Sequence, residues 1–166
     1  MIDPDLSPTI AVESIASPDA RALIALLDAD ISERYPNPDD NFFELSPEEV
    51  APENGAFVIA RANGRAIGCG AVRRIDATTA EIKRMYVARE ARGRGVSRRI
   101  LAALEDEARR IGVTRLVLET GDRQVEAVAL YLRAGFERIP RFGEYVTAPL
   151  SACFGKDLEP RSISAG

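Results

Sequence analysis

The sequence predicts an α/β domain with one mixed, mostly antiparallel sheet, a central parallel βαβ unit and helices on both faces. Residues 56–62 and 66–74 have strand-like patterns joined by Asn63-Gly64, a turn pair that tolerates positive φ and favours a tight hairpin. Residues 80–120 then follow the order strand, helix, strand. A unit of this length pairs its two strands in parallel with a right-handed crossover.

The N-terminal part contributes a strand, a helix and a second short helix. Residues 9–14 resemble a strand, and Ser17-Pro18 supplies an N-cap and a first-turn proline for the helix, which ends at the proline-rich residues 35–38. Ser46 and Glu49 have capping-box spacing, which predicts a short helix before the turn at residues 54–55. The predicted inner face of the first helix carries Ala22, Leu23, Leu26 and Leu27.

The C-terminal part continues with two further helices and four strands. Gly112 and Gly135 stand where helices commonly stop, and the apolar positions before them recur at helical spacing. The strands are expected at residues 80–87, 116–120, 136–138 and 151–157, and the helices at about 97–111 and 124–134. The predicted order is therefore βααβββαβαββ.

Composition excludes several classes of protein. The 166 residues are 46% apolar and 29% charged, which predicts one domain over residues 1–166, with a core at about 9–158 and frayed ends. The net charge of −4 argues against nucleic-acid or membrane coating, and the absence of histidine removes His-based triads and His-ligated zinc, so no metal is expected. Cys69 and Cys153 form no CxxC or disulfide framework. An acidic start without a long apolar run fits a cytoplasmic protein.

An arginine-rich loop carries the strongest functional signal. Residues 89–99 connect a strand to a helix N-terminus, and Gly93 and Gly95 allow backbone N–H groups to converge on an anion. A tight turn before a solvated basic helix is the alternative. The dinucleotide fingerprint fails because Arg98 stands at its third glycine position, and the chain has no Walker A motif.

The loop resembles the signature of the GNAT superfamily of acetyl-CoA-dependent N-acetyltransferases, Arg/Gln-x-x-Gly-x-Gly/Ala. Here the loop reads Arg92-Gly93-Arg94-Gly95-Val96-Ser97, with serine at the last position. The similarity extends to EIKRMYV at residues 81–87 and to ALYLRAGF at residues 129–136, and the family's order of elements can be placed on about residues 56–157.

The resemblance implies a binding mode for acetyl-CoA. The parallel strands of the βαβ unit would splay, the loop from Arg92 to Ser97 would grip the CoA pyrophosphate with its backbone, and Gln124 would hydrogen-bond CoA. The strand before the loop would pair its free edge with the amides of the pantetheine arm. Met85, Tyr86 and Val87 lie at that edge, and core packing of the Met85 and Val87 side chains is compatible with this role.

The resemblance also implies catalytic residues. Tyr131 matches the tyrosine that protonates the departing CoA thiolate, although an aromatic residue on a helix face also suits core packing. Glu81, six residues before Val87 and expected on the same strand face, matches a general-base glutamate that acts through water. The alternative for Glu81 is a salt bridge with Lys83 or an arginine. Glu119 is a second candidate base.

The family builds its acceptor pocket from segments that correspond here to residues 35–50 and 140–149. Phe142, Tyr145 and Glu119 are the candidate acceptor contacts, and acidic side chains in the first segment suit an amine or are simply solvated. The favoured activity is acetyl transfer to a primary amine of a small molecule by direct attack in a ternary complex. The alternatives are acetylation of a protein N-terminus or lysine, and acyl-CoA sensing without catalysis. A homodimer is expected because relatives often form one.

Overall fold

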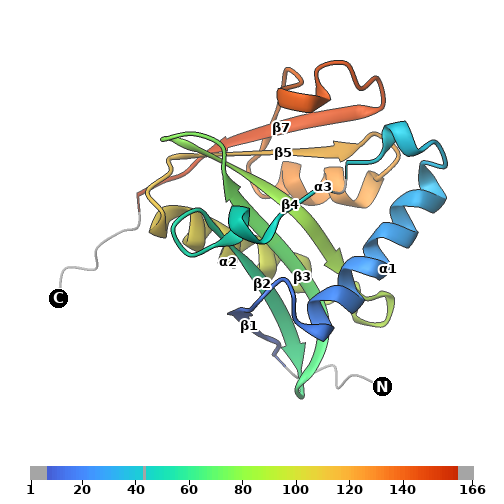
Figure 1. The fold of residues 1–166 in the computed structure, drawn as a ribbon, viewed down its shortest axis with the longest axis vertical. Coiled ribbons are helices and arrows are strands. Elements are labelled where there is room, and N and C mark those ends of the chain that lie inside the picture. The colour runs from blue at the N-terminus through green and yellow to red at the C-terminus, as the bar shows by residue number, and fades with distance from the viewer. Residues whose placement is uncertain (1–6, 43, 161–166) are drawn as a thin grey trace.

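The computed structural model describes residues 7–42 and 44–160; parts of both ends expected to fray therefore lie outside the described residues. Within these ranges, seven strands form one sheet in the order β1-β2-β3-β4-β5-β7-β6 (Figure 1). The β4–β5 pair is parallel and every other pair is antiparallel, which confirms the predicted mixed sheet. The strands are β1 (Thr9–Val12), β2 (Gly55–Ala62), β3 (Arg65–Arg74), β4 (Thr79–Val87), β5 (Arg115–Gly121), β6 (Glu137–Ile139) and β7 (Ser151–Asp157).

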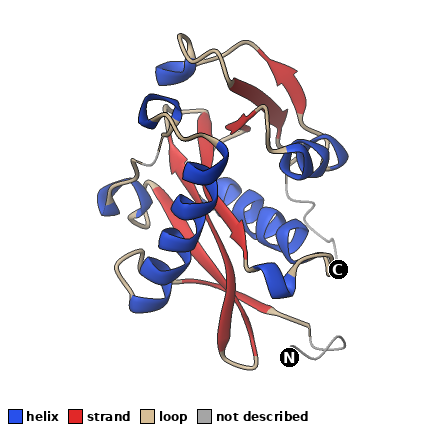
Figure 2. Ribbon diagram, turned by 90° about the vertical axis from the view of Figure 1, so that its right-hand side faces the viewer, coloured by secondary structure: helices blue, strands red, loops and turns tan. Residues whose placement is uncertain are grey.

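Three α-helices of the described chain cover the two faces of the sheet: α1 (Pro18–Arg34), α2 (Val96–Arg110) and α3 (Val125–Arg133). Figure 2 shows α1 on the opposite side of the sheet from α2. Leu23 and Leu27 of α1 pack with Phe57 and Ile59 of β2, whereas Ile100 of α2 belongs to the larger core that also includes residues of α3. The two apolar layers exclude water from both faces of the central strands.

Local signals set most element boundaries correctly. The Ser17 hydroxyl accepts a hydrogen bond from the Ala20 N–H at 3.1 Å and so caps α1 as expected. The expected inner face of α1 was partly wrong: Ala22 and Leu26 are exposed, and the helix instead buries Ala20 with Leu23 and Leu27, since those three positions lie on the face that meets the sheet.

The predicted second helix is also wrong, because residues Pro47–Val50 form only one 3₁₀ turn. The capping box is present, with the Ser46 N–H donating to the Glu49 carboxylate at 2.9 Å. Ala51, however, precedes Pro52 and adopts an extended conformation with ψ 153°, which is the conformation that a following proline favours. The chain therefore leaves the turn and enters β2.

A β-bulge in β4 reverses the alternation of its side chains. Cys69 pairs with Tyr86 and Ala71 pairs with Lys83, so Arg84 and Met85 together oppose one residue of β3, and Arg84 adopts a positive φ of 61°. Glu81 consequently lies opposite Arg73, but Val87 lies opposite Gly68, five positions along β3. The expectation that Glu81 and Val87 share a strand face is wrong for this reason.

The two parallel strands separate halfway along their length. Pairing between β4 and β5 begins at Thr79 with Arg115 and ends at Ile82 with Leu118. Beyond that pair, β4 continues along β3 while β5 continues along β7. The sheet therefore forks at its centre, and the inner edges of both strands beyond the fork face a gap in the ladder.

Candidate active site

A cavity of about 600 Å³ occupies the fork between β4 and β5. Its walls come from the second half of α1, the outer part of β4, the arginine-rich loop, the end of β5, and α3. Tyr145, from the 3₁₀ turn Gly143–Tyr145, closes one side. The fork therefore brings the three segments of the family resemblance to one site.

The arginine-rich loop presents a helix N-terminus to this cavity. Gly95 is the N-cap of α2 with a φ of 77°, and the first intrahelical bond runs from the Arg99 N–H to the Gly95 carbonyl. The amides of the first helical turn lack intrahelical acceptors and carry the positive end of the helix dipole. Of the loop residues predicted to bind CoA, Arg92, Gly93, Gly95, Val96 and Ser97 line the cavity, whereas Arg94 is not among the lining residues.

Arg92 fixes the loop to its neighbours. Its Nε donates to the Val87 carbonyl at 2.9 Å, its guanidinium lies 5.6 Å from the centre of the Tyr86 ring, and it forms an ion pair with Asp30 of α1 at 3.2 Å. Arg89 reaches the same carboxylate at 3.2 Å. Because Asp30 already offsets part of this positive charge, the side chains of Arg89 and Arg92 position the loop, and its backbone amides are the better anion donors.

The outer half of β4 offers an unpaired edge to an extended ligand. Met85, Tyr86 and Val87 lie beyond the last β4–β5 pair and line the cavity, as does Gln124 just before α3. An extended chain of amides can satisfy such an edge by pairing with it like an added strand. The edge and the helix N-terminus together fit an elongated anionic ligand with amide groups.

Tyr131 of α3 lies in the wall of the cavity and is buried. Its ring packs edge-on against Phe136, with centroids 5.7 Å apart, so Tyr131 also contributes to the packing of the core. Burial raises the pKa of the Tyr131 phenol well above its usual value, and the negative charge of Glu119 raises it further. The phenol therefore stays protonated at neutral pH and can donate a proton.

Glu119 lines the same cavity from β5. Burial raises the pKa of its carboxyl group to about 7, although a hydrogen bond from the Ser151 hydroxyl opposes that shift. The charges of Glu81 and Glu144 add to the rise and the charge of Lys83 opposes it. A carboxyl group with this pKa can accept a proton near neutral pH.

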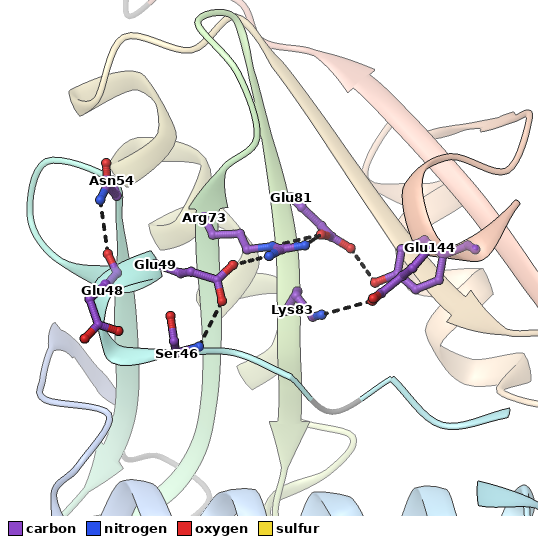
Figure 3. Close-up of polar contacts among 9 residues, drawn as sticks. Ser46, Glu48, Glu49, Asn54, Arg73, Glu81, Lys83 and Glu144 are labelled. Carbon is purple, nitrogen blue, oxygen red and sulfur yellow. Dashed lines mark hydrogen bonds and ion pairs between the residues drawn. The ribbon is translucent and has the colours of Figure 1, made fainter. Parts of the chain in front are cut away.

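Glu81 lies behind the cavity in a buried polar network (Figure 3). It is 1% exposed, and Arg73 donates to its Oε1 from Nε at 3.0 Å and from Nη2 at 2.8 Å. The Tyr145 hydroxyl donates to its Oε2 at 2.6 Å, and Arg73 also pairs with Glu49. The expected salt bridge with an arginine is therefore present, and Glu81 is not among the residues that line the cavity.

Tyr145 joins this network to the part of the cavity that Phe42 lines. Its ring packs edge-on against Phe42 at 4.9 Å and against Phe142 at 5.3 Å between centroids. Phe42 and Tyr145 line the cavity, whereas Phe142 supports Tyr145 and is not a lining residue. Burial and the neighbouring Glu81 raise the pKa of Tyr145, which keeps its hydroxyl a donor.

Tyr35 is a cavity residue whose contacts sequence reasoning missed. Its hydroxyl accepts a hydrogen bond from the Arg123 N–H at 2.6 Å and so ties the end of α1 to the turn after β5. A Cβ atom at Gly121 would lie 2.1 Å from that hydroxyl, so the contact requires glycine there. The sequence placed Tyr35 at a helix end and at the start of the segment expected to form the acceptor pocket, and neither signal carries information about so distant a partner.

Residues 7–42 and 44–160 contain no group of three or more histidine, cysteine, aspartate and glutamate side chains arranged to hold a metal ion. No helix in these ranges combines the length and apolar character that crossing a membrane requires.

Comparisons with known proteins agree with the fold. The family model of the Acetyltransferase (GNAT) family matches residues 20–136. The chain is 39% identical over 152 residues to an IAA acetyltransferase from Azospirillum brasilense, covering 90% of this chain and 97% of that protein. A Klebsiella pneumoniae crystal structure, provisionally described as an acyl-CoA N-acyltransferase, matches with a TM-score of 0.78 and 32% identity, over 95% of this chain and 100% of that chain.

A third comparison shows the same fold in a protein with ligand. A GNAT family acetyltransferase from Elizabethkingia anophelis with acetyl-CoA bound matches with a TM-score of 0.65 and 20% identity, over 91% of this chain and 98% of that chain. The family model spans more than half of the sequence, and the relatives match nearly its full length. The chain therefore belongs to the GNAT acetyltransferase family and is an acyltransferase.

Proposed function

We propose that this enzyme transfers the acetyl group of acetyl-CoA to a primary amine of a small molecule by direct attack within a ternary complex. One observation carries the proposal: the fork between β4 and β5 places an anion-binding helix N-terminus, an unpaired strand edge, Tyr131 and Glu119 around a single cavity. The helix N-terminus suits the pyrophosphate of acetyl-CoA, and the strand edge suits its pantetheine arm. Tyr131 and Glu119 supply the proton transfers that acetylation of an amine needs.

The residues present fit acetyl-CoA. The backbone amides from Gly93 to Ser97 would hold the pyrophosphate, and no heavy atom lies within 4 Å of a Cβ built on Gly95, so an oxygen can approach the backbone closely. The free edge of β4 from Met85 to Val87 would pair with the pantetheine amides. Gln124 lies across the cavity, where it would contact the same arm.

Glu119 and Tyr131 would divide the proton transfers between them. Glu119 accepts a proton from the acceptor ammonium group, the free amine attacks the thioester carbonyl, and the new C–N bond forms as the C–S bond breaks. Tyr131 donates its proton to the departing thiolate, because a phenol is protonated where a thiol begins to ionise. The acylated nitrogen then releases its second proton to the Tyr131 oxygen, which restores the phenol and leaves a neutral amide and a neutral CoA thiol. Cys69 and Cys153 are buried and line no part of the cavity, which favours direct attack over an acetylated cysteine.

Glu81 stays a candidate general base that can be tested beside Glu119. With Glu119 as base, kcat/KM rises with pH through about 7, the pKa of its buried carboxyl group, and Glu119→Gln removes this limb of the profile. Glu81→Gln would then lower activity by releasing Arg73 and Tyr145 while the limb persists. Loss of the limb in Glu81→Gln alone would instead identify Glu81 as the base.

The direct test is release of free CoA thiol from acetyl-CoA in the presence of a panel of small primary amines and lysine-containing peptides. Amine-dependent release far above hydrolysis is expected with small amines. Preferential turnover of peptides would support the protein-acetylating alternative. Tight acetyl-CoA binding without turnover of any amine would support the sensor.

We also propose a cytoplasmic location and a homodimer. The location is supported by two buried free thiols, Cys69 and Cys153, which a reducing compartment would preserve. The homodimer rests on the family resemblance. A single 18.0 kDa species in sedimentation velocity at micromolar concentration would contradict it.

A further inference from the structure

We infer that Lys83 anchors a carboxylate of the acceptor, so that the acceptor is a short amino carboxylate such as an α- or β-amino acid. The reaction it would undergo rests on the proposed function, but the anchor itself is a binding site that can be tested without turnover.

Lys83 and Glu119 are the first residues of their strands beyond the fork. The last β4–β5 pair joins Ile82 to Leu118, so Lys83 and Glu119 follow it directly. Side chains alternate along a strand, so Lys83 lies on the same face of the sheet as Glu81, and Glu119 lies on the same face as Val117. Glu81 and Val117 are paired across the two strands. The two side chains therefore lie on the same face of the sheet, and both line the cavity.

Lys83 is a buried cation whose positive charge is only weakly offset by its acidic neighbour Glu144. Its side chain is 5% exposed, and its Nζ lies 3.7 Å from Oε1 of Glu144, beyond hydrogen-bonding distance. The Glu144 side chain is 45% exposed, so solvent screens its charge. Figure 3 shows the Lys83 and Glu144 side chains pointing toward each other.

The two arginines that flank Lys83 in the structure have closer counter-ions. Arg73 binds both Glu81 and Glu49, and the buried Arg84 pairs with Asp28 of α1. A buried ammonium group gains most from an anion that is itself shielded from water. A ligand carboxylate inside the cavity would supply that shielded charge, whereas Glu144 supplies an exposed one.

The position of Lys83 beside Glu119 also sets the length of the acceptor. The paired strands lie about 5 Å apart up to Ile82 and Leu118, and Lys83 and Glu119 are the next residues, so an amine delivered to Glu119 and a carboxylate bound at Lys83 are separated by few bonds. A diamine would place its second ammonium group near Lys83 and be repelled. The positive charge of Lys83 lowers the pKa of Glu119. A carboxylate bound at Lys83 would offset that charge, so the pKa of Glu119 would rise and Glu119 would take up a proton more readily.

The test measures binding of N-acetylated amino acids, the expected products, to the CoA-loaded protein by titration calorimetry. The ligands are N-acetyl amino acids with small, aromatic, acidic and basic side chains, N-acetyl-β-alanine, and the matched carboxamide of each. We expect at least one carboxylate ligand to bind about 10- to 100-fold more tightly than its carboxamide, the range expected for a charge-assisted hydrogen bond.

Three substitutions of Lys83 and one matched control test whether that preference depends on Lys83. Lys83→Met keeps a similar length without charge and should abolish the preference while leaving carboxamide binding unchanged; Lys83→Gln serves the same purpose if the methionine variant misfolds. Lys83→Arg should retain the preference. Glu144→Gln, the matched control, removes the exposed counter-ion and should maintain or increase it. No preference in the wild type, or a preference that survives in Lys83→Met and Lys83→Gln, would overturn the inference.

Turnover separates this inference from the proposed function. If amines without a carboxylate are acetylated as fast as their amino acid counterparts, the carboxylate anchor is wrong and the acetyltransferase proposal stands. If the Lys83-dependent binding preference is present but no amine, with or without a carboxylate, is acetylated, the binding site stands and the proposed catalytic function fails.

Discussion

Tyr131 and Glu119 both line the cavity, and the negative charge of Glu119 raises the pKa of Tyr131. Tyr131→Phe keeps the ring that packs against Phe136 and removes the one proposed proton donor to the thiolate. We expect acetyl-CoA affinity within about threefold of the wild type and a turnover about 10- to 10⁴-fold lower, because a positioned general acid contributes up to that range. Acetyl-CoA titration and steady-state kinetics check the two values.

Two results with Tyr131→Phe would contradict the role of Tyr131 as proton donor. Wild-type turnover, with the chemical step shown to be rate-limiting, would mean that Tyr131 only packs the core. Parallel losses of affinity and stability would mean that the hydroxyl has a structural role.

Glu119 should make the stability of the fold depend on pH. Its folded-state pKa of about 7 lies above the ordinary value of 4.5, so the fold favours the neutral form. That advantage is complete below pH 4.5 and is lost as the pH rises through about 7. Glu119→Gln mimics the neutral form, and we expect it to be more stable than the wild type at pH 8 by on the order of 1 to 3 kcal/mol.

Urea unfolding at pH 5 and pH 8 measures this difference, which should shrink severalfold at the lower pH. Glu126→Gln is a matched control, since Glu126 also lines the cavity but its side chain is 86% exposed. An equal pH effect in both variants would show that burial of Glu119 is not the cause.

At the scale of the element, the loop before α2 binds through its backbone, and a pair of glycines tests this. Gly95 and Gly64 have the same φ of 77°, and neither has a heavy atom within 4 Å of a Cβ position. Leucine at either position should therefore impose a similar strain, about 1 to 2 kcal/mol. Only Gly95→Leu places a side chain where the pyrophosphate would lie, and it should weaken acetyl-CoA binding at least about 10-fold.

Thermal melts compare the two glycine variants, and titration with acetyl-CoA separates them. Gly64→Leu should bind like the wild type, because Gly64 belongs to the β2–β3 hairpin and does not line the cavity. Normal binding by a folded Gly95→Leu, or equal weakening in both variants, would contradict the loop assignment.

Elements defined by neighbouring residues were predictable, whereas their irregularities were not. Asn63 and Gly64 both adopt positive φ, as their turn chemistry requires, and Ser17 caps α1 as expected. The bulge at Arg84 has no local signal, because arginine does not favour a φ of 61°. An ion pair of the buried Arg84 with the half-buried Asp28, 56 residues away, accompanies that conformation, and such a partner cannot be inferred from the strand alone.

For the whole molecule, the order of elements predicted the parallel β4–β5 pair, but the network behind the cavity was only partly foreseen. An arginine partner for Glu81 was an open alternative, since unlike charges on adjacent strands commonly pair. The addition of Glu49 and Tyr145 depends on two loops that meet only in the folded chain. Glu119 lines the cavity and Glu81 does not, which makes Glu119 the better placed general base. This difference arises only where β4 and β5 separate in the folded chain, so the sequence alone does not reveal it.

The fork also predicts how acetyl-CoA binding affects the whole fold. The two halves of the sheet are joined across β4 and β5 by four residue pairs, from Thr79–Arg115 to Ile82–Leu118. A ligand held by the loop after β4 and by α3 beyond β5 would bridge these halves, so its binding should oppose global unfolding. At 100 times Kd the stabilisation is about 2.7 kcal/mol, which corresponds to a rise in Tm of about 5 to 10 °C for a chain of this length.

Differential scanning fluorimetry with acetyl-CoA, CoA and free pantetheine measures this effect. CoA should compete with acetyl-CoA and produce a similar rise, whereas pantetheine should act only at far higher concentration, because it lacks the phosphates that the α2 N-terminus would bind. At the same ligand concentration, Gly95→Leu should reduce the rise by about half or more, and Tyr131→Phe should keep it. Equal effects of pantetheine and CoA would show that the strand edge, and not the loop, dominates recognition, and no rise at saturating acetyl-CoA would remove the binding site from the fork.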